Sequence, residues 1–169
     1  TPGIPNDGTV ILEASCDFNG DGSCDTTDLS SVDGFYSVGS LTEGVTVPPA
    51  DAKFDLTSNS RVDVLDLEKW LSDAAMENGL LSAYLGGDTD LNGRVEFSDF
   101  VTLSSRFGTG TEWSGGNFNG DGTVSFVDFV TLSNNFNMSN VAGLSPVPEP
   151  GFLILISLGF FGNVFLFRR

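Results

Sequence analysis

Apolar residues recur at helical spacing in three parts of the chain. Within each part they lie three, four or seven residues apart, which places them on one face of an α-helix. They are Leu67, Trp70, Leu71 and Ala74, then Phe100, Leu103 and Phe107, and finally Phe129, Leu132 and Phe136. The pattern predicts three amphipathic helices, and the last two agree so closely that we interpret them as copies of an internal repeat.

A polar stretch of twelve residues precedes each of these helices, and a fourth stretch of the same kind lies nearer the N-terminus. Each has oxygen-bearing side chains at positions 1, 3, 5, 9 and 12. We name the stretches loop 1 (residues 17–28), loop 2 (55–66), loop 3 (88–99) and loop 4 (117–128). Glycine at position 6 of loops 1, 3 and 4 favours a tight turn, so loop 2, with Ser60 there, should be the most strained. The apolar residue at position 8 of loops 2, 3 and 4 is expected to form a short strand that joins paired loops.

A hard divalent cation explains this spacing. Calcium binds six to eight oxygen ligands, and a loop wound around it presents alternate side chains, while the carbonyl of position 7 completes the set. We therefore predict that the loops bind up to four Ca²⁺ ions, most strongly in loop 3. The predicted ligands, with position 7 acting through its carbonyl, are Asp17, Asn19, Asp21, Ser23, Asp25, Asp28, Asp55, Thr57, Asn59, Arg61, Asp63, Asp66, Asp88, Asp90, Asn92, Arg94, Glu96, Asp99, Asn117, Asn119, Asp121, Thr123, Ser125 and Asp128. The alternative is that Asp, Asn and Gly are present only because they form turns.

The loops differ from ordinary EF-hands in two ways. An apolar helix follows a loop but none precedes it, and position 12 is Asp where an EF-hand has Glu. In these features the loops resemble type I dockerin repeats, which occur as pairs of half EF-hands. The resemblance implies a mainly α fold with two dockerin-like pairs, at residues 16–78 and 86–138, in which each calcium loop has an exit helix. It also implies a cohesin-like partner that contacts positions 10 and 11, although Phe97 and Phe126 stand here where cellulosomal dockerins have small polar or basic residues.

The chain of 169 residues has a net charge of −16, and most of its acidic side chains occupy predicted ligand positions. Carboxylates crowded in a loop repel one another, so we expect folding to depend on bound metal. Nucleic acid is a poor partner for such a charge. Because the chain contains no histidine, Ser-His-Asp and Cys-His catalytic groups are excluded. The acidic residues outside the loops stand singly, without the second carboxylate that a glycosidase needs, and we expect no enzymatic activity.

The two cysteines of the chain lie at the first loop. Cys16 directly precedes loop 1 and Cys24 lies within it. We predict a disulfide between them, formed in an oxidising compartment. Two free thiols are the alternative.

The C-terminal residues 151–167 contain no charged side chain, and Arg168 and Arg169 follow them. A run of this length predicts one C-terminal transmembrane helix, at the short end for a bilayer core; a buried core helix is the alternative. By the positive-inside rule the two arginines stay in the cytoplasm, and the residues before the run lie outside the inner membrane.

The apolar run follows a Ser/Pro stalk, residues 139–150, which ends in Pro148, Glu149 and Pro150. This order resembles the PEP-CTERM sorting signal. The resemblance implies an exosortase-type processing enzyme as a partner, a precursor anchored in the inner membrane by residues 151–169, and final export to the cell surface or extracellular matrix. Dockerin-like repeats ahead of such a tail are similar to surface proteins of the planctomycete type.

The N-terminal residues 1–15 include a β-prone run, Thr9 to Leu12, and show no signal peptide. An exported protein needs a signal peptide, so the chain is either a mature form or a piece of a longer protein, and in the second case residues 1–15 would be the end of an upstream β domain. The first hypothesis for the whole chain is a non-catalytic, calcium-binding surface module that attaches to a matrix polysaccharide or a cohesin-like protein. The second is a docking module of a polysaccharide-degrading protein whose catalytic domain lies upstream.

Overall fold

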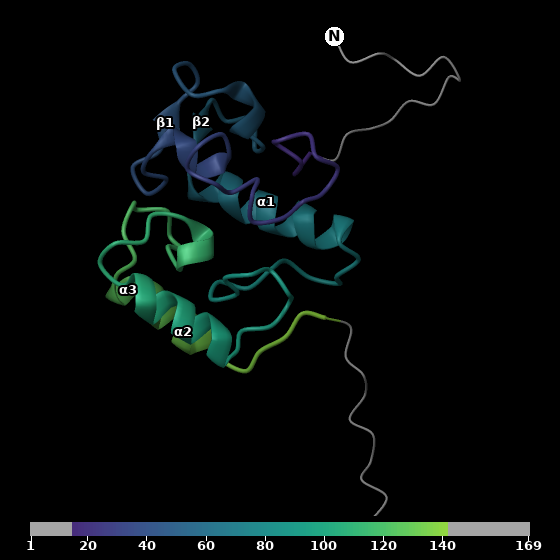
Figure 1. The fold of residues 1–169 in the computed structure, drawn as a ribbon. Helices are drawn as coiled ribbons and strands as arrows, with labels where there is room; N and C mark the ends of the chain where they lie inside the picture. Colours follow the sequence, from purple (N-terminus) through teal and green to yellow (C-terminus); the bar gives the residue numbers. More distant parts are fainter. Residues whose placement is uncertain (1–14, 142–169) are drawn as a thin grey trace, which may run out of the picture.

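The computed structural model describes residues 15–141, in which three α-helices and a small sheet alternate with long loops (Figure 1). The helices are α1 (Val64–Glu77), α2 (Phe97–Arg106) and α3 (Phe126–Asn135). Strands β1 (Val45–Thr46) and β2 (Arg61–Val62) pair antiparallel, and short 3-10 turns form at η1 (Phe35–Val38), η2 (Ala52–Phe54) and η3 (Trp113–Gly115). Together the helical turns make up about 35% of this part of the chain.

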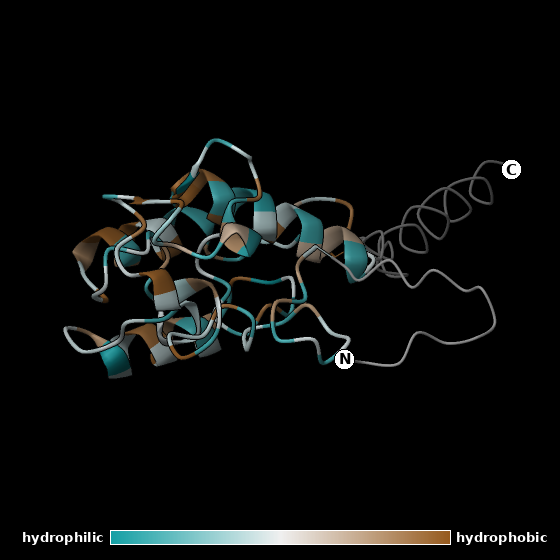
Figure 2. Cartoon of the chain, turned by 90° about the horizontal axis from the view of Figure 1, so that it is seen from above, coloured by the Kyte–Doolittle hydropathy of each residue, from teal (hydrophilic) through white to brown (hydrophobic). Residues whose placement is uncertain are grey.

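Each α-helix begins at position 10 of a loop because positions 9 and 12 cap it. The side chain of position 9 meets the backbone of position 12, and the side chain of position 12 meets the backbone of position 9, which forms a capping box in α1, α2 and α3. A capping box satisfies amide donors that the first turn of a helix leaves free. Apolar and polar residues alternate along the helices in Figure 2, as amphipathic helices require.

The predicted mainly α fold with an exit helix after every loop is wrong, because loop 1 has none. After Asp28 the chain turns at once, and the Phe35 N–H donates to the Asp28 carbonyl at 2.7 Å. Gly34 makes this turn possible, since a Cβ at Gly34 would lie 2.4 Å from that same carbonyl oxygen. Residues 30–34 also lack the apolar spacing of a helix face. Long loops therefore dominate the fold.

The structure also does not support the predicted transmembrane helix. Among residues 15–141 no helix is long and apolar enough to cross a membrane. The longest is α1, with 14 residues, which span about 21 Å against the roughly 30 Å of a bilayer core. The apolar run 151–167 lies outside the described residues.

In the first half of the structure, residues 15–78, loop 1 packs against α1. Cys16 and Cys24 form a disulfide with a Cα–Cα distance of 5.4 Å, and both are buried. The Trp70 indole N–H of α1 donates to the Cys16 carbonyl, and the Asn78 amide donates to the Cys24 carbonyl, both at 2.8 Å. Loop 1 is therefore held by a covalent bond and by the following helix.

In the second half, residues 86–141, α2 lies beside α3, and Leu103 of α2 and Leu132 of α3 are buried. The strand expected at position 8 forms in loop 2, where Val62 of β2 pairs with Val45 of β1, but no strand in residues 15–141 joins two paired loops. The backbone of Val95 pairs with the segment after α3, through Met138 at 3.0 Å, and the backbone of Val124 pairs with the segment after α2, through Gly108 and Gly110 at 2.8 Å. Loops 3 and 4 are thus each bound to the end of the other repeat instead of to each other.

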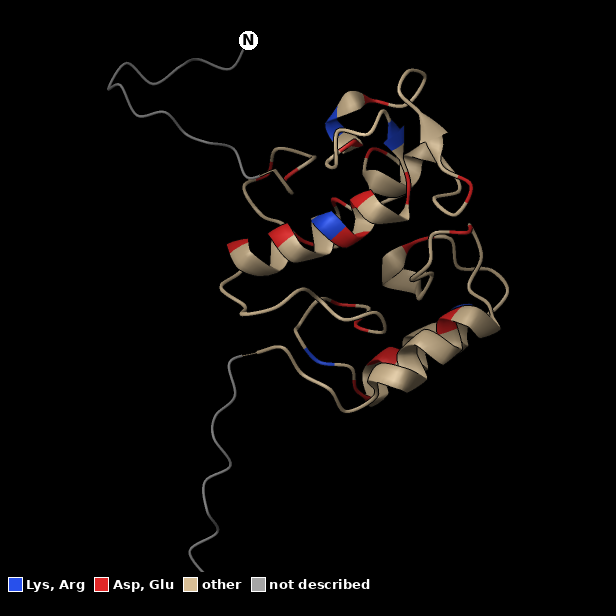
Figure 3. Cartoon of the chain, turned by 180° about the vertical axis from the view of Figure 1, so that it is seen from behind, with Lys and Arg blue, Asp and Glu red and all other residues tan. Residues whose placement is uncertain are grey.

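The two halves lie against each other, with η3 and the segment after α1 between them (Figures 1 and 3). The Tyr84 N–H donates to the Leu71 carbonyl of α1 at 3.3 Å. A crevice of about 370 Å³ remains at this contact, lined by Leu67 of α1 and by Trp113 and Phe118 of the second half, among others. The connector of residues 31–53 also contacts the second half, through Leu41 and Tyr36.

Candidate metal centres

The four loops share one backbone conformation. Positions 4 and 6 have positive φ angles between 55° and 93° in every loop, a region that L-residues other than glycine avoid. The residues concerned are Gly20 and Gly22, Ser58 and Ser60, Leu91 and Gly93, and Gly120 and Gly122. Loop 2 reaches this shape with no glycine at either position, so it is the most strained loop, as expected.

The side chains of positions 1 and 5 hold this shape by binding the backbone. The oxygen atoms of position 1 accept N–H groups from positions 4 to 6 at 2.7–3.1 Å in all four loops. The side chain of position 5 accepts the N–H of position 7 at 2.8–3.0 Å. Oxygen atoms at alternate positions therefore converge towards the inside of each loop. This arrangement is local, since every bond lies within twelve residues.

The carboxylate of position 12 closes each loop. Its Oδ1 accepts an N–H from position 2 or 3 at 2.7–2.9 Å, and its Oδ2 accepts the N–H of position 9 at 2.8–2.9 Å. The four residues, all completely buried, are Asp28, Asp66, Asp99 and Asp128. Each carboxylate oxygen has two lone pairs. Every Oδ1 accepts a second donor as well, whereas the Oδ2 atoms of Asp28, Asp66 and Asp99 have one donor each and keep a lone pair for a cation.

The side chain of position 9 caps the segment that follows each loop. It accepts N–H groups of that segment, as in Asp25 with Thr27 at 2.8 Å and Asp63 with Leu65 at 2.9 Å. Glu96 and Ser125 occupy the N-cap positions of α2 and α3. The structure thus employs position 9 to start the next helix or turn.

Loop 3 is where carboxylates come closest together. Oxygen atoms of Asp88, Asp90 and Asp99 all lie within 4.8 Å of one another. Asp88 and Asp99 are buried, whereas Asp90 is exposed at the opening. Loop 3 was also predicted to be the strongest site, and here the structure brings together three of its six predicted ligands.

The crowding in loop 3 raises a pKa. Burial raises the pKa of the Asp88 carboxyl to about 7, and the neighbouring Asp90 and Asp99 add to the rise. The N–H groups of Gly93 and Asn92 only partly offset it. Near neutral pH the cluster therefore holds negative charge that has no cationic side chain to balance it, since the described ion pairs involve only Arg61 and Lys69.

The other loops have weaker acidic centres. Among residues 15–141 no second group of three carboxylates is as close as that of loop 3. Loop 4 has Asn117 and Asn119 at positions 1 and 3, and loop 2 has Thr57 and Asn59 at positions 3 and 5. In loop 1, burial raises the pKa of Asp28. Acidic residues are nevertheless spread over loops of both halves, with few basic residues among them (Figure 3).

Two residues that support loop 3 were missed by the sequence analysis. The Thr89 hydroxyl, at position 2, donates to Asp99 Oδ1 at 2.6 Å. The Trp113 indole N–H donates to the Asp88 carbonyl at 2.7 Å, and Trp113 is almost completely buried. The spacing rule assigns no role to position 2, and Trp113 lies 25 residues from Asp88, so the ligand pattern contained no signal for either.

The donor set of loop 3 fits a hard cation. Its side chains offer carboxylate and amide oxygens, and the described chain has no histidine or free cysteine to offer nitrogen or sulfur. Oxygen ligands suit calcium and magnesium, and soft donors would be needed for zinc or copper. Asp88, Asp90, Asn92 and Asp99 are the side chains that would hold the ion.

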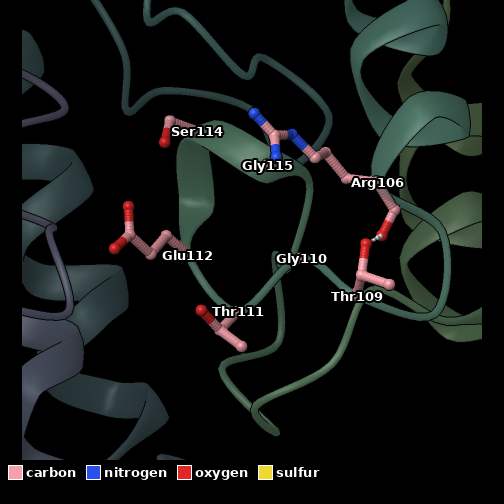
Figure 4. Close-up of a pocket in the computed structure, with 7 residues that line it drawn as sticks. All are labelled: Arg106, Thr109, Gly110, Thr111, Glu112, Ser114 and Gly115. Atoms are coloured by element: carbon pink, nitrogen blue, oxygen red, sulfur yellow. Dashed lines mark hydrogen bonds between the residues drawn. The ribbon is translucent and has the colours of Figure 1, made fainter.

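A polar pocket of about 270 Å³ lies outside the four loops (Figure 4). Its lining includes Arg106 from the end of α2 and Glu112 and Ser114 from the link before loop 4. Glu112 is already engaged, because its Oε1 accepts the N–H of Ser31 at 3.0 Å. The pocket is open and lacks a cluster of converging groups, so we assign no site to it.

Comparison with known families finds the PEP-CTERM protein-sorting motif at residues 146–169. Motifs of this kind are recognised by an exosortase, and the match identifies an exported, surface-sorted protein. The motif, with the predicted residues Pro148, Glu149 and Pro150, lies outside the described residues. No dockerin or EF-hand family is found for the loops. Comparison with curated proteins and with solved structures gives no match.

Proposed function

We propose that residues 15–141 form a non-catalytic, calcium-stabilised module of a protein exported to the cell surface or extracellular matrix. The cluster of Asp88, Asp90 and Asp99 is the observation that carries this proposal. Three carboxylates this close disfavour the calcium-free fold, and a divalent ion placed among them would remove the repulsion. Loops 1, 2 and 4 share the backbone of loop 3 and are proposed as weaker sites, for up to four ions.

An exported module of this kind meets calcium outside the cell. Extracellular calcium modules bind at about 10⁻⁴–10⁻³ M, so sites with few carboxylates would still fill there. The disulfide of Cys16 and Cys24 agrees with an oxidising compartment. Metal would then complete the fold only after export, when the exosortase-sorted protein reaches its destination.

Calorimetric calcium titration of the whole chain tests the proposal, with circular dichroism before and after chelation. We expect saturable binding and a gain of ordered structure. Asp90→Asn should weaken the tightest site about tenfold, because it removes the one exposed carboxylate of the cluster. Asp33→Asn is the matched control, since Asp33 is equally exposed and lies outside the loops. An absence of calcium binding by the wild-type chain would refute the proposal.

A docking function is the second candidate, and an exposed row of aromatic rings favours it. The row runs Phe97, Phe100, Phe129, Phe126 across α2 and α3, with neighbouring ring centroids 5.8–6.4 Å apart. Phe97 and Phe126 are each 68% exposed. Contiguous apolar surface of this kind is typical of protein interaction sites, and both outer rings occupy position 10 of a loop, where dockerin-like modules would contact a cohesin-like protein.

Binding to a panel of purified cohesins would test this second function. The double variant Phe97→Ser and Phe126→Ser should lose binding while it keeps its calcium titration, because neither side chain belongs to the donor set. Val32→Ser is a control, since Val32 is exposed at a site remote from the row in sequence. If no cohesin binds the wild-type chain, the docking function is excluded for that class of partner.

A further inference from the structure

Loop 4 is covered by a segment that comes from the other half of the molecule. The Leu41 N–H donates to the Gly120 carbonyl at 2.7 Å. The Leu41 side chain is completely buried and lies on Gly120, where an added Cβ would be 2.6 Å from Leu41 Cδ1. Gly20 is the same position in loop 1 and also has positive φ, yet nothing lies within 4 Å of its would-be Cβ. The cover is therefore present on loop 4 and absent from loop 1.

A second contact anchors the start of the same loop. The Tyr36 hydroxyl of η1 donates to the carbonyl of Asn117, at position 1, over 2.7 Å, and both residues are buried. Asn117 in turn accepts the Gly120 N–H through its side chain at 3.0 Å. The connector thus binds position 1 through Tyr36 and position 4 through Leu41, and these two positions are also hydrogen-bonded to each other.

Loop 3 has its supports in its own half. Its position 1 carbonyl is bound by Trp113, and its position 6 is packed by Val141, whose Cγ1 would lie 2.7 Å from a Cβ on Gly93. Loop 4 has also fewer carboxylates, only Asp121 and Asp128 at ligand positions. A loop with little charge depends more on a preformed backbone, because less binding energy is available to order it.

We infer that Leu41 and Tyr36 are positioning residues for a calcium site in loop 4, so that filling this loop and docking the two halves stabilise each other. The inference rests on the proposed calcium function. The loop shape itself is set by local hydrogen bonds, and the connector adds two contacts that brace it while the halves are docked. Thermodynamic linkage then requires that an ion bound in loop 4 strengthens the docking by the same factor.

Calcium titration of the ¹⁵N-labelled full chain can read the two loops separately, through the amide signals of Gly93 in loop 3 and Gly122 in loop 4. In Leu41→Ala the midpoint of the Gly122 signal should rise about tenfold, within the usual range of coupling between sites. The Gly93 midpoint should stay within about twofold of the wild type. Leu41→Met should restore most of the Gly122 affinity, because it refills the space over Gly120.

Two further variants separate positioning from general loss of stability. Tyr36→Phe removes only the hydroxyl that binds Asn117 and should shift the Gly122 midpoint in the same direction, so it serves if Leu41→Ala does not fold. Leu29→Ala truncates an equally buried leucine beside loop 1 and should leave the Gly122 midpoint unchanged. An equal shift of Gly93 and Gly122, or an equal effect of Leu29→Ala, would overturn the inference.

The wild-type titration distinguishes this inference from the proposed function. If Gly93 responds to calcium and Gly122 does not, loop 4 is no calcium site and the inference fails, while the proposed function stands. If neither signal responds, both fail.

Discussion

Replacing Asp88 by asparagine should stabilise the calcium-free protein at neutral pH. The pKa of this carboxyl is raised from 3.8 to about 7 in the folded state, and each pKa unit corresponds to 1.36 kcal/mol. The shift of about three units thus opposes folding by at most ~4 kcal/mol above pH 7. Solvent reaches the cluster at the exposed Asp90 and screens the repulsion, which reduces the expected effect to about 2 kcal/mol.

The sign follows from the direction of the shift. Because the folded state holds its proton more tightly than the unfolded chain, the wild-type free energy of unfolding should fall as the pH rises from about 4 to 7 and then level off. In Asp88→Asn this fall should be smaller, and part of it should remain because burial also raises the pKa of Asp28. Asparagine fits position 1, as Asn117 shows in loop 4, where it accepts the Gly120 N–H at 3.0 Å.

Denaturant unfolding in calcium-free buffer between pH 4.5 and 8 measures both curves. At pH 7.5 the free energy of unfolding of the variant should be about 2 kcal/mol higher than that of the wild type, which corresponds to a midpoint about 7 °C higher in a thermal scan. With calcium added the order should reverse, because the wild type binds calcium more tightly than the variant, whose loop 3 has one carboxylate fewer. A calcium-free variant less stable than the wild type at pH 7.5 would refute the reasoning, since the hydrogen bonds of Asp88 would then outweigh its repulsion.

Three other predictions concern the frame that holds the loops. Replacing Cys16 and Cys24 by serine should cost about 2–3 kcal/mol of unfolding free energy through the lost loop constraint, measured by denaturant unfolding. Trp70→Phe leaves the buried Cys16 carbonyl without its donor and should cost about 1–2 kcal/mol in the same assay; an unchanged midpoint would contradict this. Burial raises the pKa of Tyr36 well above 10, so stability should be unaffected by this group up to pH 10 and fall above it, and the Tyr36 phenolate should appear only with unfolding. Absorbance of two phenolates, from Tyr36 and Tyr84, before unfolding would contradict that expectation.

The conformation of the loops was predictable because it is local. Asx residues at position 1, glycine at position 6 and Asp at position 12 bind backbone groups within the same twelve residues, so a single stretch of sequence contains the whole pattern. The start of each α-helix follows for the same reason, since positions 9 and 12 form the capping box. The sorting motif was recognisable because short linear signals need no folded context.

Most failures came from contacts beyond the twelve residues of a loop. The backbone partners of position 8 in loops 3 and 4 lie after the helix of the other repeat, and Val62 of loop 2 pairs with Val45 of the connector. After loop 1 the chain forms a turn, in which the Phe35 N–H donates to the Asp28 carbonyl, instead of an exit helix. Spacing alone also gave loop 1 as many carboxylates as loop 3, yet among residues 15–141 only loop 3 brings three of them within 4.8 Å of one another. Which side chains meet depends on how the loops are packed.

The sequence by itself therefore determined four loops of one shape, the helices that leave three of them, and an exported protein with a sorting motif. Tertiary structure decided that loop 3 gathers its carboxylates and is bound by Trp113. It also decided that loop 4 is held by Tyr36 and Leu41, which lie about 80 residues away along the chain. The physical reason is the distance along the chain between the residues in contact. Hydrogen bonds within a loop are specified by neighbours in sequence, whereas burial and packing depend on how distant segments of the chain fold against one another.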